Sequence, residues 1–168
     1  MKKLIVISVI LILAITPATS VSAQTGDQVL VTPYFQDEIT VSTEDELILA
    51  SGWAACTPGL VKAWINASYY QWYMDSTPIL PEEDAFNYWG PIEPRGSSPS
   101  CIIGTGNIWG SSWRYSIGSL TAGTYVISLT YGSDHKMIDG GDYDGDGHLD
   151  FFEGEREKAV IVHVVEPQ

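Results

Sequence analysis

Residues 120–131 have the sequence LTAGTYVISLTY, and their pattern points to an all-β fold. From Tyr125 to Tyr131 an apolar residue occupies every second position, with Ser128 and Thr130 between them. A period of two turns one side of the chain toward a core and the other toward solvent, which is typical of a half-buried β-strand. The stretch therefore predicts a strand that starts directly after the turn at Ala122-Gly123.

The same composition recurs along the chain and predicts an all-β protein. The segments rich in β-branched and aromatic residues are separated by turns that contain Gly and Pro. The long segment 60–75 is expected to be a strand, with a helix over 60–67 as the alternative for its first half. The other expected strands are 28–34, 38–41, 46–55, 109–120 and 159–165.

The residues LTAGTY (120–125) resemble the tyrosine corner of immunoglobulin-like and fibronectin type III-like sandwiches. In those folds a Tyr near the start of the penultimate strand bonds back to the backbone across the corner, and Tyr125 would take this role. The resemblance implies an immunoglobulin-like β-sandwich of about seven strands, with residues 24–168 as a single domain. Ile127 stands where antibody domains have their second Cys.

Cys56 and Cys101 are the two cysteines of the chain. An even count in an exported protein predicts a disulfide, which would stabilise the fold by about 4 kcal/mol in the chain-entropy model; two buried thiols are the alternative. Cys101 would staple the Pro-, Gly- and Ser-rich segment 77–106, expected to be a long loop without regular structure. Such a loop serves either as a contact surface or as a cover with Trp89 as its plug.

Residues 142–153, DYDGDGHLDFFE, predict a calcium site because they match the pattern D-x-[DN]-x-[DN]-G-x5-E. Calcium takes six to eight oxygen ligands, and Gly147 permits the sharp turn around the ion. The side chains of Asp142, Asp144 and Asp146, the backbone carbonyl of His148, Asp150 directly or through water, and two oxygens of Glu153 would supply them.

This stretch resembles the loops of EF-hands, dockerins and thrombospondin type 3 repeats, and the resemblance covers these twelve residues alone. The flanks differ from an EF-hand because the upstream segment has no helical period and the downstream segment 159–165 predicts a strand. One short helical turn is expected over 151–158, and the loop would connect the last two strands from about 132 to 158. An acidic surface turn without an ion is the alternative.

The N-terminus predicts export. Residues 1–23 have two Lys, a twelve-residue apolar core and the cleavage site Val21-Ser22-Ala23, as in a secretory signal peptide; an uncleaved anchor is the alternative. The protein is therefore expected to be secreted, extracellular or periplasmic, without membrane insertion after cleavage. Residues 24–168 hold six Lys and Arg against 21 Asp and Glu, a formal charge of −15 that excludes nucleic acid and anionic membranes as partners.

No common catalytic motif is present, so a non-enzymatic role is expected: a calcium-binding module that is structural, adhesive or binds a protein or carbohydrate at the cell surface. An enzyme is an alternative, namely a glycosidase that uses two opposed carboxylates. A carbohydrate-binding module is another, with Tyr88, Trp89, Tyr70 and Trp72 as exposed platforms unless these rings fill the core. A third is an inhibitor or enzyme accessory that makes contact through segment 77–106.

Overall fold

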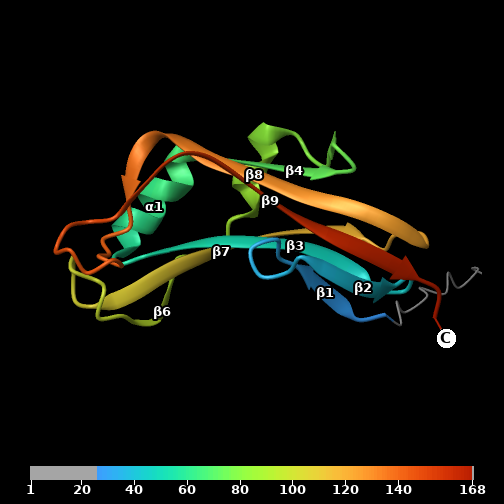
Figure 1. Cartoon of the computed structure of the whole chain (residues 1–168), viewed down its shortest axis with the longest axis horizontal. Coiled ribbons are helices and arrows are strands. Elements are labelled where there is room, and N and C mark those ends of the chain that lie inside the picture. Colours follow the sequence, from blue (N-terminus) through green and yellow to red (C-terminus); the bar gives the residue numbers. More distant parts are fainter. Residues whose placement is uncertain (1–25, 168) are drawn as a thin grey trace, which may run out of the picture.

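Two β-sheets pack face to face in the computed structural model, which describes residues 26–167 (Figure 1). The all-β sandwich class predicted from the alternating segments is therefore confirmed, whereas the signal peptide predicted over residues 1–23 lies outside the described residues. Residues 26–167 form nine strands, against about seven expected. They are β1 Gln28–Val31, β2 Glu38–Ser42, β3 Glu46–Ala55, β4 Ser68–Met74, β5 Thr77–Pro78, β6 Glu93–Ser97, β7 Asn107–Gly118, β8 Gly123–Ile138 and β9 Phe151–Val165.

The first two strands, β1 and β2, belong to different sheets. The four-stranded sheet has the order β1-β3-β7-β6, and the five-stranded sheet has the order β2-β9-β8-β4-β5. β1 runs parallel to β3 and β2 runs parallel to β9, whereas the other strand pairs are antiparallel. β1 covers β3 only over Glu46–Leu49, and β2 covers β9 only over Ile161–Val165. Within residues 26–167, the rest of each long strand, six of ten residues in β3 and ten of fifteen in β9, has no neighbouring strand on that side.

The core between the sheets is dominated by aromatic rings. Trp64, Trp72 and Trp113 are all fully buried. The rings of Trp72 and Trp113 stack between opposite sheets with centroids 5.4 Å apart. A buried aromatic side chain removes 150–250 Å² from water, which at about 25 cal/mol per Å² is worth roughly 4–6 kcal/mol. These rings therefore supply much of the force that holds the two sheets together.

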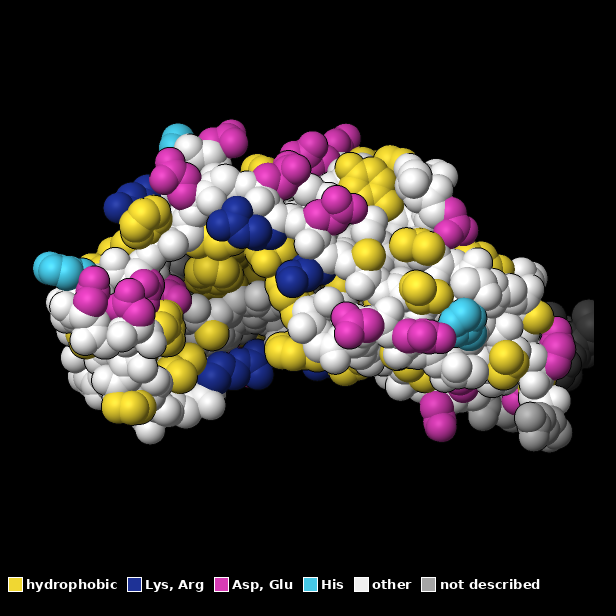
Figure 2. Space-filling view, viewed as in Figure 1, with side chains coloured by type: hydrophobic (Ala, Val, Ile, Leu, Met, Phe, Trp, Pro, Cys, Tyr) yellow, Lys and Arg dark blue, Asp and Glu magenta, His cyan; other side chains and the backbone are white. Residues whose placement is uncertain are grey.

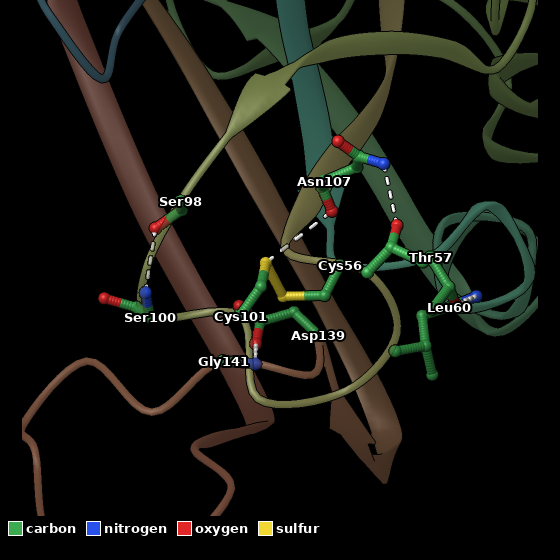
Figure 3. The surroundings of a disulfide bond; sticks show 10 residues. Cys56, Thr57, Leu60, Ser98, Ser100, Cys101, Asn107, Asp139 and Gly141 are labelled. Atoms are coloured by element: carbon green, nitrogen blue, oxygen red, sulfur yellow. Dashed lines mark hydrogen bonds between the residues drawn. A yellow bond between two sulfur atoms is a disulfide. The ribbon is translucent and has the colours of Figure 1, made fainter.

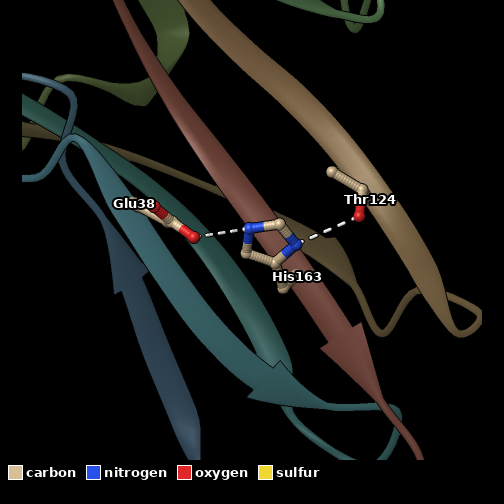
Figure 4. Close-up of polar contacts among 3 residues, drawn as sticks. All are labelled: Glu38, Thr124 and His163. Atoms are coloured by element: carbon tan, nitrogen blue, oxygen red, sulfur yellow. Dashed lines mark hydrogen bonds and ion pairs between the residues drawn. The ribbon is translucent and has the colours of Figure 1, made fainter.

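Two side chains, Tyr125 and His163, fix the C-terminal strands through hydrogen bonds. The hydroxyl of Tyr125 donates to the backbone carbonyl of Thr121 at 3.0 Å, so the predicted corner bond is present. On the outer face of the five-stranded sheet, the two ring nitrogens of His163 lie 2.7 Å from a Glu38 carboxylate oxygen and 3.0 Å from the Thr124 hydroxyl (Figure 4). His163 in β9 thereby joins β2 on one side to β8 on the other.

The strand expected over residues 60–67 is wrong, because Pro58–Ala67 forms the helix α1. The side chain of Thr57 accepts the backbone N–H of Leu60 at 3.3 Å as an N-cap, and Pro58 occupies the first turn, where its fixed φ suits a helix. Val61, Trp64 and Ile65 follow the helical spacing and are buried on one face. Capping and this burial outweigh the strand propensity of the aromatic residues; the second half of the segment is the strand β4, as predicted.

Segment 77–106 is not without regular structure, which corrects the expectation of a long loop. It contains β5, the 3₁₀ helix η1 (Glu82–Tyr88) and β6. The indole N–H of Trp113 donates to the carbonyl of Ala85 at 2.6 Å, and the half-buried Trp89 meets Tyr70 edge to face at 5.2 Å. The segment thus covers the core, and its Trp89 packs against the core beside Tyr70.

The last two strands are longer than predicted. Residues 151–158 continue β9 and form no helical turn, because they pair with β8 across the sheet. The connection between β8 and β9 therefore shrinks from about 132–158 to residues 139–150.

The Tyr125→Phe substitution is expected to lower the free energy of unfolding by about 1 kcal/mol, because it removes the hydroxyl that hydrogen-bonds to the carbonyl and to the side chain of Thr121 and leaves the ring in place. Urea unfolding measures this loss. Tyr73→Phe is the matched control, since the half-buried Tyr73 makes no hydrogen bond through its hydroxyl within residues 26–167. Equal losses in the two variants would contradict a role for the corner bond.

Candidate metal centre

The 139–150 connection lies at the end of the sandwich that carries the disulfide (Figure 3). Cys56, directly after β3, and Cys101, in the loop between β6 and β7, form the predicted bond, with Cα atoms 5.4 Å apart. The disulfide thus confirms the pairing expected from the cysteine count, and it brings two distant segments to the base of the β8–β9 connection.

Backbone hydrogen bonds join this connection to both disulfide-linked segments. The N–H of Cys56 donates to the carbonyl of Asp139 at 2.6 Å, and the N–H of Asp142 donates to the carbonyl of Ser100 at 2.9 Å. Gly140 lies between these contacts with φ +88°, and a Cβ at this position would lie 2.9 Å from the Cβ of Cys56. The base of the loop is therefore fixed by contacts that only Gly140 permits.

The structure gathers the first three predicted ligands. Asp142, Asp144 and Asp146 can each place one carboxylate oxygen so that all three lie within 4.8 Å of one another. Oxygens bound to one Ca²⁺ at 2.3–2.6 Å lie at most about 5.2 Å apart, so the three carboxylates fit around a single ion. Gly145 and Gly147 adopt positive φ angles of 81° and 85°, which lets the chain turn tightly between the carboxylates.

Backbone N–H groups of the loop point at the same carboxylates. Asp142 accepts from Gly145 at 2.7 Å through one oxygen and from Gly147 at 2.9 Å through the other. The surrounding chain desolvates Asp142 and would raise its pKa, but these N–H donors outweigh that effect and hold the pKa below its usual value. Partial burial, together with the negative charge of Asp139, raises the pKa of Tyr143 to about 12. The loop thus holds ionised carboxylates in a negative field.

The side chains of Asp150 and Glu153, two further predicted ligands, lie outside this group of carboxylates. The N–H of His148 donates to Asp146 at 2.8 Å, while one carboxylate oxygen of Asp150 accepts the N–H of Tyr143 at 2.6 Å. Glu153 is exposed in β9 and does not belong to the cluster of carboxylates. The structure therefore brings together three of the five predicted carboxylate ligands. Glu153 lies outside the group because a strand stands where an EF-hand has its exiting helix.

The aromatic candidates divide into buried and half-buried rings. Tyr70 is 3% exposed and Trp72 is fully buried, so neither can serve as a surface platform. Tyr88, the last residue of η1, and Trp89, which follows it, are half-buried. A pocket of about 310 Å³ lies beside them and combines aromatic rings with carboxylates. Its lining comprises Ser68, Tyr69, Tyr70, Glu82, Glu83, Ala85, Phe86 and Trp89.

Sequence reasoning missed this pocket, although Glu82 and Glu83 stand next to each other in the chain. The signal that could have found it is the acidic start of η1 directly before Phe86, combined with Trp89 one turn later. The pocket forms only when η1 folds back against β4, which a local pattern does not show.

Comparisons with known proteins give no family. No family model matches the chain, and no curated protein matches it. Among solved structures, the chain is similar to the cysteine protease inhibitor EhICP2 from Entamoeba histolytica, with 11% identity and a TM-score of 0.34 over 84% of this chain and 98% of that one. A likeness at this level carries no argument about function. Within residues 26–167, every helix is too short or too polar to span a membrane.

Gly140→Ala is expected to lower the free energy of unfolding by about 2–4 kcal/mol, because the added methyl meets Cys56 and the φ of +88° disfavours a side chain. Gly145→Ala is the matched control: its φ of 81° is similar, but nothing lies within 4 Å of the added methyl. It should cost about 1 kcal/mol. Denaturant unfolding in EDTA measures both, and similar losses would contradict the close packing at Gly140.

Proposed function

We propose that the protein is a secreted, non-enzymatic β-sandwich module that binds Ca²⁺ at residues 142–153 and uses the ion to stabilise the disulfide end of the sandwich. The observation that carries this proposal is the group of three carboxylates, which can share oxygens within 4.8 Å of one another at the tip of the β8–β9 connection. When bound, the ion supplies positive charge that relieves their mutual repulsion.

Asp142, Asp144 and Asp146 would hold the ion, with the carbonyl of His148 and water molecules as further oxygen donors. Asp150 and Glu153 would complete the shell by turning toward the ion. Both are available for this, since Asp150 is held by one hydrogen bond from a backbone N–H to its carboxylate and Glu153 has no hydrogen bond or ion pair within residues 26–167. Ca²⁺ suits such a flexible, exposed site better than Mg²⁺, which demands a near-ideal octahedron.

The proposed role is structural because the loop is tied to the rest of the fold. Asp142 is a proposed ligand, and its own N–H bonds to Ser100 beside the disulfide. An ion that orders Asp142 would therefore also order segment 98–106 and the start of α1. A surface stiffened in this way is suited to an adhesive or binding role toward a protein or carbohydrate at the cell surface.

Calcium is expected to raise the melting temperature of the purified protein. If the site has a Kd of about 10 μM, then about 1 mM Ca²⁺ adds roughly 2.7 kcal/mol of stability, which corresponds to a rise of several degrees. The melt is recorded in EDTA, in Ca²⁺ and in Mg²⁺. Asp144→Asn should abolish the rise, because it removes one of the three clustered carboxylates.

Glu157→Gln is the control for that variant, since it removes one exposed carboxylate from β9 outside the loop. It should keep the full response to calcium. No rise in several millimolar Ca²⁺, or the same rise in Asp144→Asn as in the unaltered protein, would overturn the proposed site.

A second candidate function is carbohydrate binding, and the pocket beside η1 favours it. The pocket offers the rings of Phe86 and Trp89 next to the carboxylates of Glu82 and Glu83. Aromatic faces pack on the apolar faces of sugar rings, while carboxylates accept hydrogen bonds from sugar hydroxyl groups. Tyr70 contributes only to the wall of this pocket, and Trp72 takes no part.

Titration with a panel of neutral polysaccharides is expected to shift the tryptophan fluorescence if this pocket binds sugar. Phe86→Ala should weaken that binding about fivefold through the loss of one ring contact. Phe35→Ala is the control, because it removes another exposed Phe on a different part of the surface. The absence of a fluorescence shift across the panel would remove this candidate.

A further inference from the structure

The half of β3 that β1 leaves uncovered borders a groove of about 810 Å³. Five consecutive residues of β3, from Ala50 to Ala54, line it. The loop after β1 closes one end with Tyr34 and with Phe35, which is 88% exposed. The side chain of Gln36 holds this loop by accepting the N–H of Thr32 at 2.7 Å and donating to the carbonyl of Leu30 at 3.2 Å. The groove is therefore preformed.

Backbone groups along this edge of β3 have no partner in the described chain. β1 pairs with β3 no further than Leu49, and beyond that point β7 is the one neighbouring strand. Successive residues of a strand direct their N–H and C=O groups to opposite edges. Within residues 26–167, no hydrogen bond reaches the backbone of Ala50–Ala54 from the side opposite β7. The edge is thus open to pairing with one more strand.

Positive charge gathers on this groove in a strongly acidic protein. Arg95, Arg114 and Lys158 line it and are three of the six Lys and Arg in residues 26–167, which also hold 21 acidic residues. Within residues 26–167 no Lys or Arg forms an ion pair with a carboxylate. Figure 2 shows a hollow on this side of the molecule with hydrophobic side chains inside it and Lys or Arg side chains around it.

The three positive charges lie on both faces of the open β3 edge: Arg95 and Arg114 on the outer face, and Lys158 on the inner side. Arg114 pairs with Ala50 across the outer face of the four-stranded sheet, where Arg95 also lies over Gly110. Lys158 pairs directly with the buried Leu129 and therefore points from the inner face of the other sheet. It remains exposed because β2 does not cover this part of β9. On the same inner side, Trp53 offers an apolar wall.

We propose that the groove binds an extended, acidic segment of a partner protein, which adds a strand to the open edge of β3. Main-chain hydrogen bonds to Ala50–Ala54 would supply the pairing. Side chains of an added strand alternate between the two faces. Acidic residues on the outer face would meet Arg95 and Arg114, and apolar residues on the inner face would pack toward Tyr34 and Trp53. An alternating acidic and apolar sequence is therefore the complementary ligand.

The open strand edge favours a peptide over an acidic polysaccharide, because a polysaccharide cannot supply the alternating N–H and C=O groups that continue a sheet. Charge also disfavours a second copy of this chain, since two molecules of formal charge −13 repel each other. The recognition site is distinct from residues 142–153, so its occupation does not depend on the proposed calcium binding.

The test uses the purified ¹⁵N-labelled protein and a capped peptide of about eight residues in which valine and glutamate alternate. Backbone amide resonances of Ala50–Ala54 are expected to shift, and the affinity should fall as NaCl is raised. Arg114→Glu should weaken binding about fivefold or more by removing an attraction and adding a repulsion. Lys62→Glu is the control, since it reverses an exposed charge on α1 outside the groove, and it should leave the affinity nearly unchanged.

Two further peptides separate edge pairing from simple charge attraction. A peptide of alternating valine and lysine should bind far more weakly, and a valine–glutamate peptide methylated at alternate backbone nitrogens should lose binding because it cannot pair on one edge. Equal binding of the methylated peptide, tighter binding of polygalacturonate, or no shift at millimolar peptide would overturn the proposal. So would a concentration-dependent dimer that occupies the β3 edge without peptide.

Discussion

The long antiparallel pairing of β8 with β9 organises both the core and the disulfide end of the sandwich. It runs from Gly123 to Ile138 against Phe151 to Val164 and is the longest strand pair of the described chain. Its inner face supplies Ile127, Leu129, Val160 and Val162 to the core, and its far end carries the acidic connection beside the disulfide. This one hairpin therefore contributes to the core, carries the candidate metal loop and places Lys158 at the groove.

The short N-terminal strands create the groove. β1 and β2 cover only the half of the sandwich that includes Leu49 and Val162. In the other half, other elements have to fill the space between the two sheets. There α1 and a cluster of rings fill the space between the sheets: Trp53 stacks on Trp64 with centroids 3.7 Å apart, and Phe152 meets Trp64 edge to face at 5.0 Å. Rigid aromatic packing keeps the sheets apart, and the exposed edge of β3 remains accessible beside it.

Charge separates into an acidic loop and a basic groove. The 142–153 loop concentrates carboxylates whose mutual repulsion a divalent cation would relieve, whereas the groove concentrates unpaired Arg and Lys. In a chain with formal charge −13, such a local excess of positive charge creates a field that attracts acidic groups at short range. The proposed metal site would serve the stability of the fold, and the groove would serve recognition.

Sequence patterns alone predicted seven of the nine strands of residues 26–167 at least in part, together with the disulfide, the Tyr125 corner and the clustering of Asp142, Asp144 and Asp146. Alternation, an even cysteine count and dense acidic spacing are local features, whereas β5 and β6 form only against distant strands. A strand was predicted where helix α1 forms, although Thr57-Pro58 is a typical helix start. The aromatic residues that follow the N-cap also have a high strand propensity. Only the tertiary structure decided that Tyr70 and Trp72 are buried and that Glu153 extends a strand away from the Asp cluster. The open edge of β3 was likewise visible only in the tertiary structure. A sequence pattern does not show which distant strand pairs with β3 or at which residue that pairing stops.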